Sequence, residues 1–295
     1  MTRGFLFAAT GPDYTSLAQQ AAATVATHHP DIDIDLFTDQ DCDFPVFSQI
    51  HKLTQNTTRP RFEALLRSRF SKTICLDSDL FVLASIADVF DVLDRFDIAL
   101  AHDQRLNISG HTLVRHTKPI PAAFPQYNSG VIGLKKSAQT DAFLTHWKTA
   151  FEQSSLKIDQ PILRETLFDS DLRIATLPPQ YNIIDCDLIR SWDTRTIAPR
   201  VLHSSRIRTP QHHADTDIRT PLDLVGPQFL NHINAWQNRD ATLVKHPIPE
   251  RLPAFCDSYP TQKIAAGDDP FAGRKIPIWK RLAYRLSAFV LRENS

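Results

Sequence analysis

The sequence predicts an α/β fold in which helices flank a mostly parallel, mixed sheet. Strand-like and helix-like segments alternate from the N-terminus to about residue 155, which is typical of βαβ units. The clearest strand, residues 73–76, is apolar or β-branched throughout, as expected of a strand buried on both faces. Two carboxylates follow it directly, at the strand end where open α/β sheets bind ligands.

The other elements follow from the spacing of apolar residues. The expected strands are short apolar or alternating runs bounded by turn residues. In chain order they are residues 5–9, 32–37, 97–101 and 128–134, with shorter candidates at 173–176 and 200–202. The expected helices keep apolar residues at helical spacing. They are residues 14–28, 62–70, 85–96, 138–151 and 222–236, with a further helix that starts near residue 159.

The composition is that of an ordinary globular protein, and its charge balance argues against one class of partner. Hydrophobic residues make up 42% of the 295 residues and charged residues 22%, so the chain can bury a sizeable core. Lys+Arg and Asp+Glu both number 33. Because the whole molecule has no net charge to attract it to a nucleic acid, we expect no nucleic-acid partner.

The cysteines and the N-terminus predict a cytoplasmic protein. The cysteines lie at positions 42, 75, 186 and 256 and form no CxxC pair. This spacing argues against a zinc site or a disulfide framework and favours a reducing compartment. The apolar run near the N-terminus is too short for a secretory signal, and no stretch approaches about 18 apolar residues.

The character of the sequence changes near residue 246, so we expect one domain over residues 1–245 and an extension over residues 246–295. Six prolines fall between positions 247 and 277, which predicts an extended segment or a linker. Residues 278–292 then keep Trp and Leu on one side and basic residues on the other, which predicts an amphipathic helix.

Two interpretations of this terminal helix stay open. From Arg274 onward six Lys and Arg residues stand against Glu293, a local charge of about +5. The helix could bind an anionic membrane surface, on the inner face of the membrane, as an acceptor carried on a lipid would require. Alternatively, it docks on the domain and leaves its basic face in solvent.

The triplet Asp77-Ser78-Asp79 is the strongest sign of chemistry in the chain. In an extended chain residues two apart point the same way, so Asp77 and Asp79 would face one site. Two close carboxylates repel unless a cation lies between them, and hard oxygen ligands suit Mg²⁺ or Mn²⁺. The alternative is a polar strand end at which Asp79 caps the following segment.

Further polar residues fall at the expected ends of strands or at the start of a helix, where one crevice would collect them. They are Asp39, Asp103, Asn128, Ser129, Asp159, Gln160 and His203. Each has a structural alternative as well. Asp39 and Asp103 could be turn or loop residues and Asn128 a satisfied amide, while Asp159 could serve only as a helix N-cap and His203 as a structural histidine.

The order of these motifs resembles the retaining glycosyltransferases of family 8 and, more broadly, the nucleotide-diphospho-sugar transferases of the GT-A fold. The motifs are Asp77-Ser78-Asp79 after an apolar strand, Asn128-Ser129-Gly130-Val131, Asp159-Gln160 and His203. The likeness covers roughly residues 1–240. It implies a Rossmann-like GT-A sheet, a nucleotide-sugar donor, most often linked to uridine diphosphate, and transfer with retention at the anomeric carbon.

The resemblance also implies a role for each matching residue. A Mn²⁺ or Mg²⁺ ion would be held by Asp77, Asp79 and His203. The donor would be contacted by Ala8, Thr10, Asp39, Arg61, Ser78, Asp103, Asn128 and Ser129, together with the metal ligand Asp77. Asp103, Asn128, Asp159 and Gln160 would hold the hydroxyls of the transferred sugar, with Gln160 nearest the anomeric carbon. The acceptor would be a hydroxyl of a glycan or a glycolipid.

The loop after His203 departs from the family pattern. The family commonly has a Gly and then Lys-Pro-Trp there, whereas this chain has Arg206 for the glycine, Thr209 for the lysine and Gln211 for the tryptophan. Either Arg206 or Arg208 takes over the phosphate contact, because the guanidinium fork matches phosphate oxygens, or the loop binds the donor differently.

Two other functions remain as alternatives to a glycosyltransferase. A non-catalytic nucleotide-sugar-binding protein on the same scaffold is compatible with the altered loop. A sugar nucleotidyltransferase fits less well, because it needs a glycine-rich phosphate loop with a basic residue after the first strand. Gly11-Pro12-Asp13 is not such a loop, and the chain has only 8 glycines.

Overall fold

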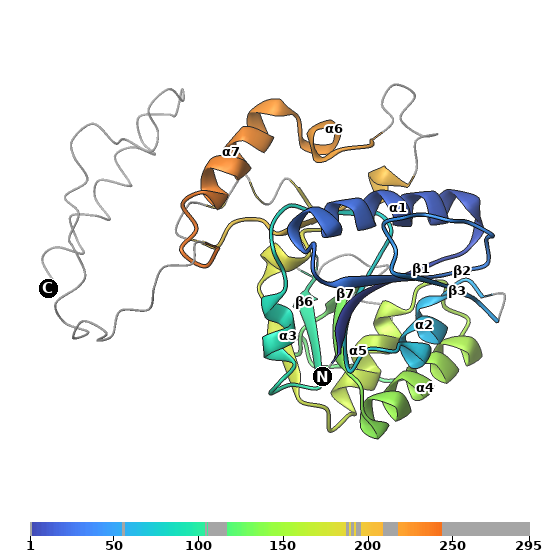
Figure 1. The fold of residues 1–295 in the computed structure, drawn as a ribbon. Helices are drawn as coiled ribbons and strands as arrows, with labels where there is room; N and C mark the ends of the chain where they lie inside the picture. The colour runs from blue at the N-terminus through green and yellow to red at the C-terminus, as the bar shows by residue number, and fades with distance from the viewer. Residues whose placement is uncertain are drawn as a thin grey trace, which may run out of the picture. The chain divides into compact units, whose positions relative to one another are not determined.

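The computed structural model describes residues 2–54, 57–103, 105, 117–186, 189, 192, 196–208 and 218–243. A seven-stranded sheet forms the centre of these residues, in the order β3-β2-β1-β4-β7-β6-β8 (Figure 1). Its strands are β1 (Arg3–Ala9), β2 (Asp33–Thr38), β3 (Gln49–Lys52), β4 (Lys72–Leu76), β6 (Ile98–His102), β7 (Tyr127–Lys135) and β8 (Ile174–Leu177). Only β7 runs against its neighbours β4 and β6, so the sheet is mixed and mostly parallel, as predicted.

Helices cover both faces of this sheet (Figure 1). One face packs against α1 (Gly11–His28) and α3 (Asp88–Val92), with Phe5 and Phe7 of β1 in its core. The other face packs against α2 (Arg61–Arg67), α4 (Ala138–Gln153) and α5 (Gln160–Phe168), and there β1 contributes Leu6. The alternation follows from the two-residue period of a strand. Both faces are buried, which explains the nearly continuous apolar strands.

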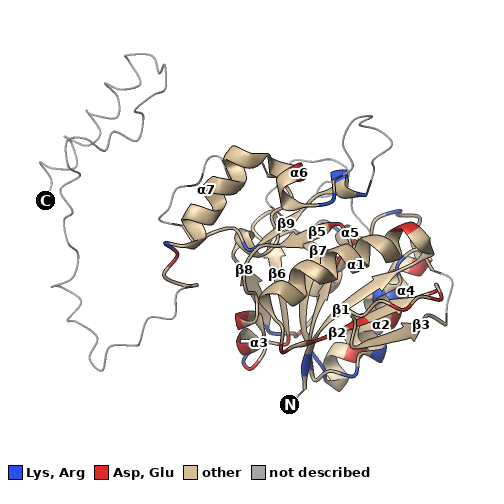
Figure 2. Cartoon of the chain, turned by 45° about the horizontal axis from the view of Figure 1, so that its top comes forward, with Lys and Arg blue, Asp and Glu red and all other residues tan. Residues whose placement is uncertain are grey.

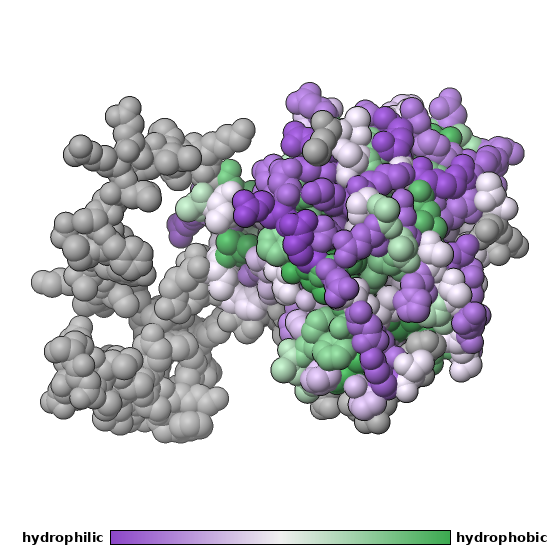
Figure 3. Space-filling model, turned by 90° about the horizontal axis from the view of Figure 1, so that it is seen from below, coloured by the Kyte–Doolittle hydropathy of each residue, from purple (hydrophilic) through white to green (hydrophobic). Residues whose placement is uncertain are grey.

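Two neighbouring strands of the sheet, β6 and β7, are almost free of charged residues. No charged residue lies in β6, and β7 has only Lys135, at its last position (Figure 2). The surface seen in Figure 3 is mostly hydrophilic, with smaller hydrophobic areas between polar side chains. Among the described residues, four large hydrophobic side chains are exposed: Tyr14, Phe96, Phe168 and Leu222.

A second, two-stranded sheet joins distant parts of the chain. Strand β5 (Leu80–Val82) follows the Asp77 triplet and pairs antiparallel with β9 (Val201–His203). Leu80 lies opposite His203 in this register. Phe81 and Leu202 pack with Trp236 in a third core cluster. The pairing therefore places His203 beside the triplet although more than a hundred residues separate them in the chain.

Several predicted elements differ from the observed ones. The helix expected over residues 222–236 is two helices, α6 (Pro221–Val225) and α7 (Pro227–Gln237). Gly226 separates them with φ +80°, a conformation that glycine adopts at little cost and that ends a helix. The helix expected over residues 85–96 is the shorter α3. Strands β3 and β5 were not predicted.

The structure does not test the predictions for the C-terminal part of the chain. Residues 244–295 lie outside the described residues, so the domain boundary at residue 246, the Pro-rich segment and the helix over residues 278–292 stay predictions. Within the described part of the chain, no helix is both long enough and apolar enough to cross a membrane.

His29 links the end of α1 to the segment before α3 through hydrogen bonds of its ring. Its Nδ1 lies 2.9 Å from the carbonyl oxygen of Val25, and its Nε2 accepts a hydrogen bond of 3.0 Å from the amide of Ile86. These contacts require the neutral ring. The side chain is buried, and burial lowers the pKa of His29 below its usual value.

We therefore expect the chain to lose stability in mild acid. The pKa of this histidine is lower in the folded chain than in the unfolded one, so its contribution is complete above the unfolded value of about 6.5 and declines as the pH falls through it. Denaturant unfolding between about pH 8 and about pH 5.5 should show this decline. His29→Gln should show a smaller decline, and an equal decline in both proteins would contradict the assignment.

Candidate functional site

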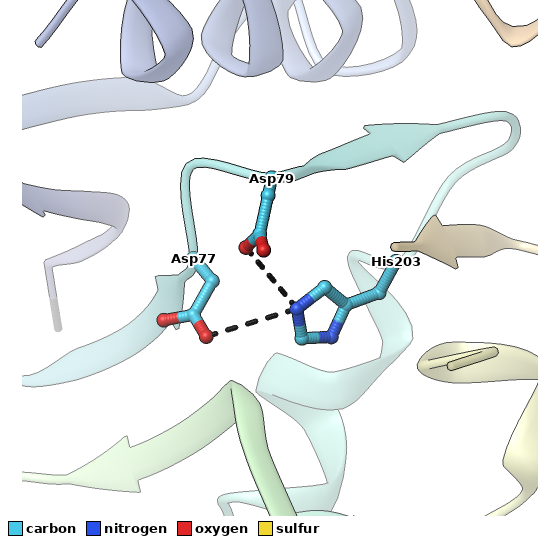
Figure 4. A group of neighbouring side chains, drawn as sticks. All are labelled: Asp77, Asp79 and His203. Atoms are coloured by element: carbon cyan, nitrogen blue, oxygen red, sulfur yellow. Dashed lines mark hydrogen bonds and ion pairs between the residues drawn. The ribbon is translucent and has the colours of Figure 1, made fainter. Parts of the chain in front are cut away.

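Asp77, Asp79 and His203 form one cluster (Figure 4). The Nε2 atom of His203 lies 3.2 Å from Oδ1 of Asp79 and 3.8 Å from Oδ2 of Asp77. The extended backbone expected for the triplet is wrong, because the chain bends at Ser78 and Asp79. The two carboxylates nevertheless converge. Asp79 faces the histidine ring, which favours the metal interpretation over the capping one.

The donor set fits a divalent cation. One ligand atom from each of the three side chains lies within 4.8 Å of the others, and Asp79 and His203 are buried. Nδ1 of His203 lies 2.9 Å from Oδ1 of Asn182. An amide oxygen only accepts hydrogen bonds, so Nδ1 carries the proton. Nε2 is then the ring atom that faces the carboxylates, and its lone pair can bind a metal once a proton there is displaced.

The same contacts shift the titration of the pair. Burial disfavours the protonated ring of His203, but the negative charge of Asp79 and the hydrogen bond to it outweigh burial and raise the pKa of His203. Burial likewise opposes ionisation of Asp79, but the charge of His203 and of Arg208 lowers the pKa of Asp79. Without a metal the cluster therefore favours a carboxylate at Asp79 and a proton on His203, and a cation that binds Nε2 has to displace that proton.

Arginines surround the cluster. Arg61 donates 2.6 Å hydrogen bonds to Oδ1 of Asp77 and to the carbonyl oxygen of Ser129. Burial opposes the charge of Arg61, but Asp77 and Asp159 outweigh it and raise the pKa of Arg61. Arg208 Nε lies 3.4 Å from Oδ2 of Asp79. One oxygen of Asp77 is thus engaged by Arg61, and the other faces His203.

Two cavities meet at this cluster. The first, of about 340 Å³, lies at the ends of β1 and β4, and Ala8, Thr10, Tyr14 and Ser78 line it. The second, of about 240 Å³, is lined by residues predicted from the later motifs: Asn128, Ser129, Asp159, Gln160 and His203. Both cavities share five residues, which are Arg59, Arg61, Asp77, Asp79 and Arg208. A ligand with a charged centre and two arms would match this layout.

Three predicted site residues line neither cavity among the described residues. Asp39 is exposed and accepts a 2.8 Å hydrogen bond from the amide of Gly11, at the start of α1. Asp103 is buried and accepts a 3.0 Å hydrogen bond from the amide of Arg105, which does line the second cavity. Arg206 is exposed. Of the two arginines proposed for the phosphate contact, Arg208 is the one that reaches the site.

Asp159 occupies the N-cap position of α5, but its side chain makes no capping hydrogen bond. It is buried, and its Oδ1 lies 3.6 Å from Arg59 Nε. Its Oδ2 lies 4.0 Å from Arg61 Nε and has no hydrogen-bond partner. The cap interpretation is therefore wrong. A buried carboxylate oxygen without a donor beside a cavity is an acceptor for a ligand's hydroxyl or amide.

Several residues of the site were not predicted. Arg59 stands two residues before Arg61, and Tyr14 is 46% exposed at the start of α1, where it lines the first cavity. Arg105 lines the second cavity. Asn182 contacts His203 from a segment without a motif. The sequence does show Tyr14 near the first turn of a helix and Arg59 two residues before Arg61. The contact of Asn182, in contrast, depends on the fold.

The fold has counterparts among solved structures. The galactosyltransferase LgtC, solved in complex with donor and acceptor sugar analogs, matches with a TM-score of 0.53 and 15% identity over 83% of this chain and 97% of that chain. The glycosyltransferase GlyE of Streptococcus pneumoniae TIGR4 matches with a TM-score of 0.53 and 18% identity, over 84% of this chain and 66% of that chain. No protein-family model and no curated protein sequence matches. The likeness confirms the predicted GT-A fold.

Proposed function

We propose that this chain is a metal-dependent glycosyltransferase that moves a sugar from a nucleoside diphosphate, with uridine diphosphate as the expected carrier, to an acceptor hydroxyl. The observation that supports it most is the position of Asp77, Asp79 and His203 where the two cavities meet. A cation there would lie next to the diphosphate of a donor that spans both cavities. The nitrogen ligand favours Mn²⁺ over Mg²⁺.

The first cavity suits the nucleoside. Tyr14 offers an exposed aromatic face on which a base can stack, and Ala8 and Thr10 leave room beside it. Arg59, Arg61 and Arg208 would face the diphosphate between the cavities. Bound at the three ligands, the metal would stabilise the negative charge of the departing diphosphate as a Lewis acid. Arg208 would move from Asp79 to a phosphate oxygen.

The second cavity suits the transferred sugar. The unpartnered Oδ2 of Asp159 would accept a hydrogen bond from a sugar hydroxyl, and the amide of Gln160 would both donate and accept. We assign no protein nucleophile. In a front-face route the anomeric carbon–phosphate oxygen bond breaks as the acceptor oxygen bonds to that carbon on the same face. Because the new bond forms on the face that the phosphate leaves, the configuration is retained, and the acceptor's proton passes to the leaving phosphate oxygen.

A non-catalytic donor-binding protein remains the second candidate, because the loop after His203 departs from the family pattern and its residues 209–217 lie outside the described part. Calorimetry with a panel of uridine, guanosine and thymidine diphosphate-sugars in Mn²⁺, paired with an assay for released diphosphate, separates the two. A transferase binds one donor and slowly releases its diphosphate, whereas a binding protein holds the donor unchanged. Absence of binding by every donor would contradict both.

We further propose that the chain is cytoplasmic and that residues 278–292 bind an anionic membrane surface, which would bring the site to a glycolipid acceptor. Their basic and apolar composition supports this. The full chain is expected to sediment with vesicles that contain anionic lipid, and less so at high salt, because the attraction is electrostatic. A chain truncated after Ile276 is the comparison, and equal sedimentation of both would contradict a membrane role for the helix.

A further inference from the structure

Asn182 belongs to no motif, yet it is the residue that joins His203 to the sheet. Its Oδ1 lies 2.9 Å from Nδ1 of His203, and its Nδ2 donates a 2.9 Å hydrogen bond to Oδ1 of Asn128. That oxygen also accepts a 2.8 Å hydrogen bond from the amide of Gly130. Asn128, Asn182 and His203 are all buried, so little water competes with this chain of hydrogen bonds.

The backbone holds Asn182 in this place. It follows the short helix Pro179–Tyr181, and the next residue, Ile183, is paired with β9. The amide of Ile183 donates to the carbonyl oxygen of Val201 at 2.9 Å, and the amide of His203 donates to that of Ile183 at 2.8 Å. The two residues that form the contact are therefore carried on paired segments, which fixes their separation.

Gly130 lies directly against the imidazole ring of His203. A Cβ atom at this position would lie 2.3 Å from Cε1 and 2.5 Å from Nδ1 of His203, far inside van der Waals contact. The ring is thus confined between the backbone of β7, the amide of Asn182 and the two carboxylates. Asn182 and Gly130, which lie outside the ligand set, therefore restrict the rotation of this ring.

We infer that Asn182 is a positioning residue for the metal site: it holds the proton of His203 on Nδ1 and so keeps the lone pair of Nε2 aimed at the cation between Asp77 and Asp79. Asn128 orients the Asn182 amide in turn. The inference rests on the proposed function for the presence of the metal. It also gives Asn128 a role beyond a contact with the donor.

The first readout is the tautomer. Nitrogen-15 chemical shifts of His203 in the protein saturated with Mg²⁺, a diamagnetic cation, should show a protonated Nδ1 and an unprotonated Nε2. Asn182→Ala should lose this single tautomer, and Asn182→Asp should keep it, because a carboxylate also accepts the hydrogen bond. A wild-type ring protonated on Nε2 would overturn the inference, whether or not the alanine variant folds.

The second readout is calorimetric titration with Mn²⁺ alone. Asn182→Ala is expected to weaken binding about 10- to 100-fold, the usual effect of losing a residue that orients a metal ligand, and Asn182→Asp should restore most of it. Gln180→Ala, two residues upstream in the same segment, is the matched control and should bind as the wild type does. Equal affinity in the wild type and Asn182→Ala overturns the inference. A wild-type chain that binds no Mn²⁺ instead contradicts the proposed metal site, and this inference with it.

Discussion

Replacing Asp79 with asparagine is expected to lower the metal-dependent release of nucleoside diphosphate by about a hundredfold or more, since a bound cation supplies several kcal/mol of charge stabilisation. Asp79 is buried, with Oδ1 3.2 Å from Nε2 of His203 and Oδ2 3.4 Å from Nε of Arg208. Asparagine keeps the shape but removes the negative charge that attracts the cation. The fold should survive, because β5 and β9 pair through their backbones.

The matched control is Asp94→Asn, the same exchange at an exposed carboxylate that pairs with the buried Lys72. Its turnover should equal that of the wild type. Initial rates of diphosphate release as Mn²⁺ is varied measure both variants, and circular dichroism checks that both are folded. Full metal-dependent turnover in Asp79→Asn would remove Asp79 from the metal site.

Replacing Gly130 with alanine should displace His203 and weaken Mn²⁺ binding about 10- to 100-fold, as the loss of a correctly oriented ligand does. The added methyl carbon would lie 2.3 Å from Cε1 of the ring. The ring cannot retreat without breaking its hydrogen bond to Asn182. Inserting a carbon into a packed site also costs about 1–3 kcal/mol of stability.

Gly133→Ala separates the two effects. It lies in the same strand, and its Cβ atom would meet Cγ1 of Val89 at 2.9 Å and Cβ of Ala99 at 3.2 Å, away from the histidine. We expect it to lower the denaturation midpoint but to leave Mn²⁺ affinity unchanged. If Gly130→Ala and Gly133→Ala bound Mn²⁺ equally well, the contact between Gly130 and His203 would have no part in the metal site.

Much of the sheet could be predicted because its signals are local. The strand expected at residues 73–76 is apolar or β-branched throughout, and it forms all but the first residue of the buried β4. The Asp77 triplet and His203 came from residue types in a recognisable order, and the structure brings them together although the expected extended backbone at Ser78 is a bend. The prediction of a metal site depended on the residue types, so the wrong backbone geometry at Ser78 did not affect it.

The rest depends on contacts between distant segments. No local pattern near Asn182 or Gly130 predicts a contact with His203. Both contacts depend on the pairing of β9 with β5 and on the segment after Tyr181, which lies along β9. The break at Gly226 was a different kind of error. Gly226 and Pro227 are visible in the sequence, but apolar residues continue at helical spacing across them, and that pattern concealed the turn.

The central claim is that Asp77, Asp79 and His203 hold a cation on which turnover of a nucleotide-sugar depends. Its most direct test is the rate of diphosphate release from the donor that binds the wild-type chain, measured with Mn²⁺, after chelation and after Mn²⁺ is restored. The account predicts release with Mn²⁺, loss of release with chelator and recovery on addition. Release that continues at the same rate in chelator would contradict it.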